Sequence, residues 1–286
     1  MPVISLRNVT HTYGEGLPIS VSAIKDINLD IESGELVGII GHTGSGKSTL
    51  VQHLNGLLKP TSGSVIIDGE DIWAKKGNIR QVRFKVGLCF QYPEYQLFEE
   101  TVFKDIAFGP KNMGLSKEET EKSVLAAAKY VGLKPELLSK SPFDLSGGEK
   151  RRAAIAGVMA MNPKILILDE PTAGLDPKGR QEILSMIKHY QRTTGSTVLL
   201  VSHSMEDVAS VATKILVMNK SRLAMYDSVE NVFSRADELQ KMGLTVPQIT
   251  RIFIGLKEKG IDVETDVYTV KEGYRRLLSM LKGGER

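Results

Sequence analysis

The segment 41-GHTGSGKST-49 carries the clearest chemistry, because it fits the pattern G-x-x-x-x-G-K-[ST]. Glycines in such a loop let backbone N–H groups converge on phosphate oxygens, and a following helix N-terminus adds partial positive charge. Lys47 supplies a point charge to the β- and γ-phosphates, Ser48 offers a hydroxyl to Mg²⁺, and Thr49 reaches another phosphate oxygen. The spacing therefore predicts a nucleotide-phosphate site made of Gly41, His42, Thr43, Gly44, Ser45, Gly46, Lys47, Ser48 and Thr49.

A second chemical signal is the run 165-ILILDE-170, an apolar strand that ends in two carboxylates. Asp169 is placed to hold Mg²⁺ directly or through water, and Glu170 can orient or deprotonate an attacking water. The alternative is a surface acidic pair that caps the next turn, and the four apolar residues before Asp169 argue against it. His203 ends another apolar run and Gln91 is a lone glutamine; taken singly, such residues are more often structural than functional.

The hydrophobic pattern predicts the elements that position these residues. Near-continuous apolar runs at 164–170 and 196–203 are typical of strands buried on both faces of a parallel sheet. Further strands are expected at 3–9, 21–31, 35–40 and 64–69, and a helix at 47–58. The pattern becomes helical from 101 to 140, which indicates a helical insertion at about 91–160 within the sheet core.

Capping signals mark several helix starts. Ser116 with Glu119 fits a capping box, and so do Thr245 with Gln248 and Thr269 with Glu272. The last two belong to a helical tail after about residue 225. Its two apolar faces are formed by Ile249, Ile252, Phe253 and Leu256, and by Tyr274, Leu277, Leu278 and Leu281.

Composition excludes several classes of protein. The 286 residues carry 37 Lys+Arg against 34 Asp+Glu, and this net charge of +3 shows no basic surplus of the kind expected for a nucleic-acid partner. The single cysteine, Cys89, cannot form an internal disulfide and suits a reducing compartment. No apolar run approaches the roughly 20 residues of a membrane-spanning helix, and the N-terminus does not resemble a signal peptide. If the protein works at a membrane, we expect it to be a peripheral membrane protein.

The segment 144-DLSGGEKRRAAIAG-157 resembles the signature motif of ATP-binding cassette ATPases. The phosphate loop, Gln91, the signature, the 165–170 strand, 174-GLD-176 and His203 follow one another in the family order, and the resemblance covers about residues 3–225. It implies an α/β fold, with a parallel-sheet core, an antiparallel β subdomain and a helical signature subdomain. It also implies hydrolysis of ATP with Mg²⁺ as cofactor.

The resemblance also implies roles for individual residues. Tyr13 matches the aromatic that stacks on adenine, and a strand-edge tyrosine is its alternative. Gln91 is a ligand of Mg²⁺, with Ser48 and Asp169, and links the Mg²⁺ and γ-phosphate region to the transporter contact. Glu170 is the base, and His203 positions the γ-phosphate and the base. In the family, two cassettes pair head to tail. Ser146, Gly147 and Gly148 would therefore contact ATP held by the other cassette, and Asp176 would lie at the seam.

One residue departs from the family pattern. The family often has glutamine after LSGG, and this chain has Glu149. A negative charge near a triphosphate is unfavourable, so we expect Glu149 to point away from the nucleotide or to pair with Arg151 or Arg152.

The segment 91-QYPEYQLFEET-101 resembles the same region of energy-coupling factor (ECF) transporters, which import vitamins or transition-metal ions. There it lines a groove for the coupling helices of the transmembrane T component. The exposed aromatic residues would form the floor of that groove, and the acidic residues would meet basic residues of the partner. A locally packed loop is the alternative.

Residues 155–180 are similar to the second of the two paralogous ATPases of ECF transporters. We therefore expect a heterodimer with the paralogous ATPase, peripheral on the cytoplasmic side of the cell membrane. The dimer would dock on a T component and on exchangeable S components, which choose the substrate. The expected domains are a nucleotide-binding domain at 1–225 and a dimerisation extension at 226–286.

Three other readings stay open at this point. An ordinary cassette importer would share all nucleotide motifs and differ in the 92–100 segment and the tail. A soluble cassette ATPase acting on DNA or the ribosome would carry a long coiled coil or a second cassette, and this chain shows neither. A non-catalytic cassette conflicts with the presence of Lys47, Asp169, Glu170 and His203.

Overall fold

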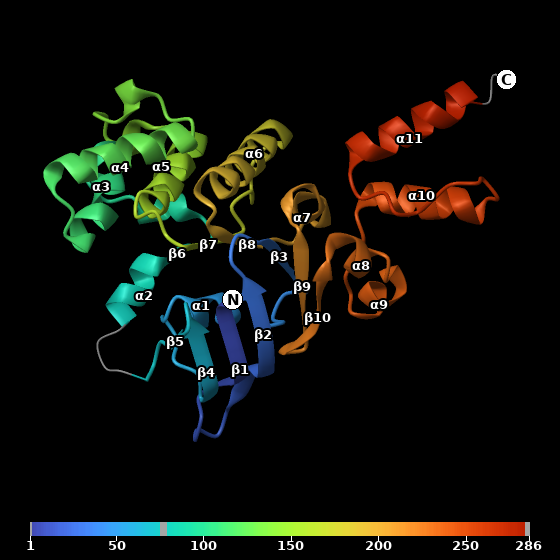
Figure 1. Ribbon diagram of the computed structural model, residues 1–286, viewed down its shortest axis with the longest axis horizontal. Coiled ribbons are helices and arrows are strands. Elements are labelled where there is room, and N and C mark those ends of the chain that lie inside the picture. Colours follow the sequence, from blue (N-terminus) through green and yellow to red (C-terminus); the bar gives the residue numbers. More distant parts are fainter. Residues whose placement is uncertain (1, 75–78, 284–286) are drawn as a thin grey trace.

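The computed structural model describes residues 2–74 and 79–283, which form two β-sheets with helices packed around them (Figure 1). The strands are β1 (Pro2–Tyr13), β2 (Val21–Glu32), β3 (Leu36–Ile40), β4 (Ser62–Ile67), β5 (Glu70–Asp71), β6 (Val86–Cys89), β7 (Ile165–Asp169), β8 (Thr197–Val201), β9 (Lys214–Asn219) and β10 (Arg222–Ser228). The α-helices are α1 (Lys47–Leu54), α2 (Ile79–Lys85), α3 (Val102–Met113), α4 (Lys117–Tyr130), α5 (Gly147–Met159), α6 (Pro177–Thr194), α7 (Met205–Val211), α8 (Val229–Phe233), α9 (Ala236–Lys241), α10 (Gln248–Glu258) and α11 (Val270–Gly283). Short 3₁₀ helices are η1 (Pro93–Gln96), η2 (Pro135–Leu137) and η3 (Pro142–Asp144).

The larger sheet has six strands in the order β10-β9-β3-β8-β7-β6. Strands β9, β3, β8, β7 and β6 run parallel, and β10 pairs antiparallel with β9 at one edge. Every residue of β3 and β8 is buried, which explains their continuous apolar sequences. Parallel strands end at a common edge, so the loops after β3, β6, β7 and β8 open on the same side.

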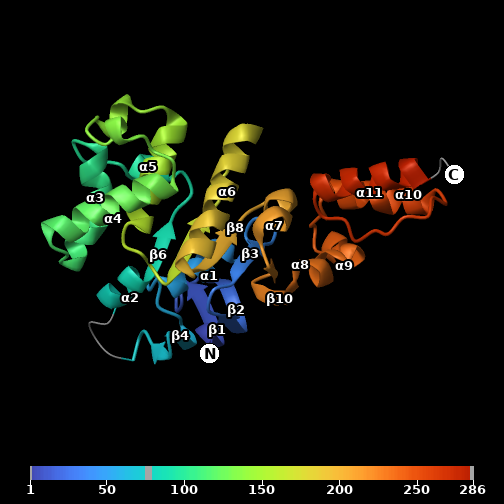
Figure 2. The same ribbon diagram turned by 45° about the horizontal axis from the view of Figure 1, so that its top comes forward.

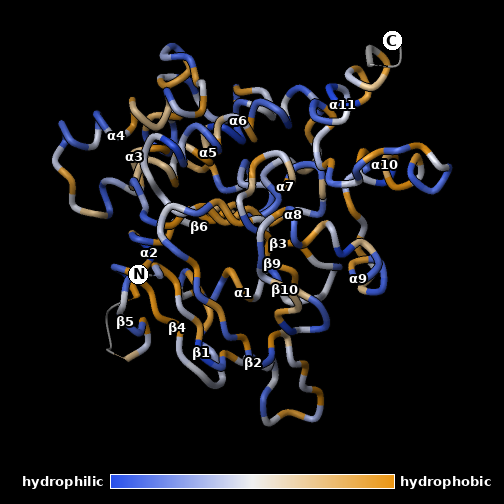
Figure 3. The backbone as a smooth tube through the Cα atoms, turned by 45° about the vertical axis from the view of Figure 1, so that its right-hand side comes forward, coloured by the Kyte–Doolittle hydropathy of each residue, from blue (hydrophilic) through white to orange (hydrophobic). Residues whose placement is uncertain are grey.

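The smaller sheet is antiparallel, in the order β2-β1-β4-β5. Helix α1 lies between the two sheets, and its Leu50, Val51 and Leu54 belong to one buried apolar cluster with residues from both sheets. In Figure 3 the apolar colouring is concentrated on the central strands. The expected parallel core with an antiparallel β subdomain is confirmed.

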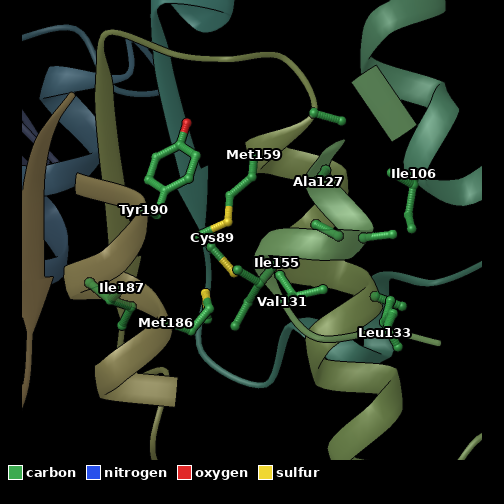
Figure 4. Packing of buried hydrophobic residues seen from close by; sticks show 14 of the residues in the cluster. Cys89, Ile106, Ala127, Val131, Leu133, Ile155, Met159, Met186, Ile187 and Tyr190 are labelled. Carbon is green, nitrogen blue, oxygen red and sulfur yellow. The ribbon is translucent and has the colours of Figure 1, made fainter. Parts of the chain in front are cut away.

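The helical subdomain consists of α3, α4, α5 and the short helices around them (Figure 2). Its core continues into the large sheet, where Cys89 of β6 packs with Tyr190 of α6 and Met159 of α5 (Figure 4). Burial raises the pKa of the Cys89 thiol to about 12, so this cysteine is an inert apolar residue. The capping box of Ser116 and Glu119 at the start of α4 is confirmed.

Helices α8 and α9 lie beside β9 and β10, and α10 and α11 pack against each other further from the sheet (Figure 1). The expected boundary after residue 225 falls inside β10, so we propose that the extension begins at α8. Its outer limit at residue 286, like the first residue of the other domain, lies outside the described residues. Among the residues that the structure describes, no helix is long and apolar enough to cross a membrane.

Of the two capping boxes predicted in the extension, the one at Thr269 forms in part and the one at Thr245 does not form. The hydroxyl of Thr269 accepts from the backbone N–H of Glu272 (3.3 Å), but the Glu272 carboxylate accepts from Tyr268 rather than from Thr269. The predicted capping box at Thr245 is wrong, because Pro247 is the N-cap of α10 and makes no side-chain bond. The backbone N–H of Gln248 donates instead to Glu206 at the start of α7 (3.0 Å).

Candidate nucleotide site at the carboxyl edge of the sheet

The phosphate loop connects β3 to α1, as its sequence predicts. Gly41 and Gly46 adopt left-handed backbone angles, φ 156° and 103°, and a Cβ at either position would lie 2.4 Å from a carbonyl oxygen. The ammonium of Lys47 donates to the carbonyls of Gly41 (2.7 Å) and His42 (3.2 Å). The buried hydroxyl of Ser45 has no hydrogen-bond partner among the described residues. A loop with a folded-back cation and an orphan hydroxyl fits a bound polyanion.

The strand β7 brings Asp169 to the same edge. The Ser48 hydroxyl donates to Asp169 Oδ2 (3.3 Å), which joins the phosphate loop to the end of β7. Burial raises the pKa of Asp169, while Ser48 and the charge of Lys47 partly oppose this effect. A hydroxyl and a carboxylate oxygen so placed are the hard ligands that Mg²⁺ prefers.

Glu170 is held in a constrained position. Its backbone has φ 51°, a left-handed value rare for a residue with a side chain, and its N–H donates to the carbonyl of Val201 (3.0 Å). The carboxylate is buried, and Oε1 has no hydrogen-bond partner within the described part of the chain. Burial, followed by the charge of Asp169, raises the pKa of Glu170 to about 7. A carboxylate with this pKa is suited to accept a proton near neutral pH.

His203 lies just after β8, with its Nε2 atom 3.4 Å from Glu170 Oε1. Burial, followed by the charge of Lys47, lowers the pKa of His203, so the ring is neutral at neutral pH. The structure therefore brings together five of the predicted site residues, namely Lys47, Ser48, Asp169, Glu170 and His203.

A buried carboxylate that sequence reasoning missed supports the His203 loop. Asp207 accepts from the Thr172 hydroxyl (2.7 Å), in the turn after Glu170, and from Arg180 Nη2 (2.9 Å), in α6. Its backbone N–H donates to Ser204, the N-cap of α7. The spacing of Ser204 and Asp207 could have indicated this cap, but nothing local to the sequence indicates the bond to Thr172.

Tyr13 and Gln91 lie at the margin of the site. Tyr13 ends β1 with its ring 44% exposed, and its hydroxyl lies 3.4 Å from the Thr49 hydroxyl. The ring of His11 packs edge-on against it. Gln91 follows β6, which pairs with β7 through Cys89 and Leu168, so it leaves the sheet beside Asp169 and is exposed.

The signature lies on the helical subdomain, at the start of α5, whereas the phosphate loop precedes α1 on the sheets (Figures 1 and 2). Ser146 is the N-cap of α5, and Gly147 and Gly148 form its exposed first turn. A Cβ at either glycine would meet no atom within 4 Å, and neither has a positive φ. Nothing in the described chain therefore requires glycine at these two positions.

Of the two arrangements expected for Glu149, the pairing with Arg151 or Arg152 is not formed. Arg151 forms a buried ion pair with Glu94 (2.7 Å), and Arg152 pairs with Glu182. Glu149 instead completes a capping box with Ser146. The arginines point away because they lie further along α5 and face other elements.

The 91–100 segment forms the short helix η1 and borders a groove of about 560 Å³. The groove is lined by apolar residues from three elements, among them Leu97, Phe98, Phe108, Val158 and Met161. The rings of Phe98 and Phe108, 60% and 47% exposed, pack edge to face. The expectation that the acidic residues of this segment meet basic residues of a partner is wrong for Glu94, which pairs with the buried Arg151. Glu100 pairs with Lys104 at the surface, and its side chain stays 80% exposed.

Comparison with known proteins agrees with this geometry. The ABC transporter family model matches residues 24–173, and an AAA domain model described as a putative AbiEii toxin matches only residues 139–208. A curated relative from Caldanaerobacter subterraneus subsp. tengcongensis is 55% identical over 280 residues, which is 98% of each chain. That relative is named energy-coupling factor transporter ATP-binding protein EcfA2.

Two solved structures share the fold. The first is cbiO1 from Clostridium perfringens, part of the ABC transporter complex cbiONQ, with a TM-score of 0.75 and 37% identity over 88% of this chain and 97% of that one. The second is the dimeric cassette MJ0796 bound to ADP and phosphate, with a TM-score of 0.71 and 31% identity over 79% and 98% of the two chains. The full-length similarity favours the ECF class over an ordinary importer cassette. The chain belongs to the ABC transporter family and, within it, to the ATP-binding proteins of energy-coupling factor transporters.

Proposed function

We propose that this chain is the ATP-hydrolysing subunit that energises an ECF importer from the cytoplasmic face of the membrane. The observation that carries the proposal is the convergence of a phosphate loop, an acidic pair and a histidine at one edge of the large sheet. The triphosphate would lie along the phosphate loop, and the ammonium of Lys47 would exchange two carbonyls for phosphate oxygens. Tyr13, exposed beside Thr49, would stack on the adenine.

Mg²⁺ fits the oxygen ligands at this edge. Ser48 and Asp169 would hold the ion, with Gln91 nearby after β6. When bound, Mg²⁺ neutralises charge on the transferring phosphoryl group. Glu170, with its unpartnered buried oxygen, would accept the proton of the attacking water, and His203 would hold the γ-phosphate and the base in register.

The signature supports pairing with a second cassette. Glycine in a helical turn costs about 0.5–1 kcal/mol relative to alanine, and two adjacent glycines open α5 without any need inside the chain. A ligand that approaches this turn from outside the chain would need the space that a side chain fills, and this explains the two glycines. We therefore place Ser146, Gly147 and Gly148 against ATP held by the paralogous cassette, with Asp176 at the seam.

The groove beside η1 fits the helix of a membrane partner. Its apolar floor includes Phe98 and Phe108, and exposed rings in a groove suit an amphipathic helix. We assign this groove to the T component, which in turn would carry exchangeable S components. ATP would favour closure of the cassette pair, because the closed state binds ATP more tightly than the open state. Closure would then move the groove and the partner helix in it.

The C-terminal extension offers a second contact between cassettes. Helix α11 exposes Val270, Tyr274 and Leu281, which are 70%, 65% and 74% exposed and spaced along one side of the helix. We propose that this stripe packs against the extension of the partner cassette.

Replacing Glu170 by glutamine tests the catalytic assignment. The amide keeps the shape of the side chain but cannot accept the proton, so kcat should fall roughly 100- to 10,000-fold. ATP binding, measured by equilibrium dialysis, should persist. Glu118→Gln, an exposed change on α4, is the matched control and should leave both unchanged. Undiminished turnover in Glu170→Gln would refute Glu170 as the base.

A further inference from the structure

The Ser146 hydroxyl is engaged by the neighbouring carboxylate. Ser146 Oγ donates to Glu149 Oε2 (2.7 Å), and the Ser146 backbone N–H donates to the same oxygen (2.9 Å). The Glu149 N–H lies 3.4 Å from Ser146 Oγ. The one hydrogen that the serine hydroxyl can donate is therefore directed at a carboxylate rather than outward.

A second capping box in the same chain, at the start of α4, provides a matched comparison. At α4 the Ser116 N–H donates to Glu119 (2.8 Å), and the Glu119 N–H donates to the Ser116 hydroxyl (3.2 Å). In both boxes the serine hydroxyl and the serine backbone N–H lower the pKa of the glutamate carboxyl, so the two boxes are built alike. They differ in their surroundings, because α5 is the helix whose first turn we place against a nucleotide.

Glu149 carries a full negative charge at neutral pH. The hydrogen bonds from Ser146 and, more weakly, the charges of Lys140 and Lys134 lower the pKa of its carboxyl. The helix N-terminus stabilises the same charge. A triphosphate that approaches Ser146 therefore meets an anion that already accepts from the hydroxyl and the backbone N–H of this residue.

We propose that Glu149 is an electrostatic gate on the composite nucleotide site, which weakens closure of this cassette over the ATP held by its partner. The inference rests on the proposed function, because it takes Ser146 to contact that ATP. In the open state the carboxylate holds the hydroxyl. In the closed state the hydroxyl turns to the γ-phosphate, and the carboxylate is left close to a like charge. With this gate, closure requires a higher concentration of ATP, and the closed pair reopens faster.

The test measures ATP-dependent association of the full-length chain with its paralogous cassette. Both partners are used with Mg²⁺, and the catalytic glutamate of each cassette is replaced by glutamine, which is Glu170→Gln in this chain, so that ATP persists at both composite sites. Glu149→Gln removes the charge and keeps a carbonyl oxygen for the Ser146 N–H. The ATP concentration for half-maximal association should then fall on the order of tenfold, and the difference should shrink as salt is raised.

Three further variants make the result decisive. Glu119→Gln changes the matching capping box on α4 and should leave association unchanged. Ser146→Ala should weaken association. Glu149→Ala, which removes the carboxylate by a different substitution, should tighten association in the same direction as Glu149→Gln.

The outcomes separate the two claims. If neither Glu149 variant associates more tightly than the parent protein, the gate is refuted. If Ser146→Ala still weakens association in that case, the contact with the partner's ATP stands. If Ser146→Ala has no effect either, the contact itself is wrong. Association that does not depend on ATP in any variant overturns the proposed function and the gate with it.

Discussion

The buried ion pair between Glu94 and Arg151 links three functional segments. Arg151, 4% exposed, donates from Nε and Nη2 to the two oxygens of Glu94, at 3.1 and 2.7 Å. Its Nη1 donates to the carbonyls of Pro171 and Ala173, in the turn after Glu170. One arginine of the signature helix thus ties the groove segment to the acidic end of β7.

Glu94→Gln should destabilise the fold measurably. The amide keeps at most one good contact to Arg151, and the guanidinium stays buried without a neutralising charge. Loss of a hydrogen-bonded charge contact costs about 1.5–3 kcal/mol, because Arg151 retains its two carbonyl acceptors. At 2–4 °C per kcal/mol for a chain of this size class, Tm should fall by roughly 3–12 °C in differential scanning calorimetry.

The control is an acidic residue in the same segment. Glu100 pairs with Lys104 at the surface and its side chain is 80% exposed, so Glu100→Gln should leave Tm unchanged within error. A double variant, Glu94→Gln with Arg151→Met, should lose less stability than the two single variants together. A Tm for Glu94→Gln equal to that of the unmodified protein would refute the structural role of this pair.

Two predictions concern other parts of the cassette. Gly148→Ala should keep or slightly raise Tm, because alanine suits a helix, and should suppress the ATPase activity of the cassette pair because the methyl group blocks the approaching triphosphate. The control is Gly255→Ala, at an equally open position in α10, which should leave the ATPase activity unchanged. A lower Tm for Gly148→Ala would show that Gly148 is needed for the stability of this chain itself. Burial lowers the pKa of His53 to about 4, so the unfolded state binds its proton more tightly. The stability from His53 is complete above pH 6.5 and is lost as pH falls towards 4. Urea unfolding should therefore show a loss of about 2 kcal/mol between pH 7 and 5 that His53→Gln removes; an equal loss in the variant would assign it to other groups.

The chemistry was predictable where a motif is short and continuous. The loop at 41–49, the carboxylates at 169–170 and the Ser116 capping box all depend on residues a few positions apart, and the structure places them as expected. The helix after the phosphate loop is shorter than the expected 47–58, because α1 ends at Leu54 and the chain turns at Gly56 with φ 68°. Strand β6 was not predicted, because its four residues follow α2 without a turn signal.

The contacts that escaped prediction join residues far apart in the sequence. Arg151 meets Glu94 because helix α5 packs on η1. Asp207 meets Thr172 because the parallel strands β7 and β8 bring the segments that follow them to one edge. The role of Glu149 is a different case, since Ser146 and Glu149 fit the same S-x-x-E signal that correctly predicted the start of α4. The local sequence therefore already specified this cap.

The most direct test of the central claim is capture of the membrane complex. The tagged chain is used as bait in detergent-solubilised native membranes, beside Phe98→Ser in the groove and Leu125→Ser, an exposed apolar control on α4. We expect the unmodified chain and Leu125→Ser to recover a paralogous cassette, one T-type membrane protein and several different small membrane proteins. Phe98→Ser should keep the cassette and lose the membrane proteins. Recovery of a dedicated permease pair with a solute-binding protein, or of ribosomes or nucleic acid without membrane proteins, would contradict the account.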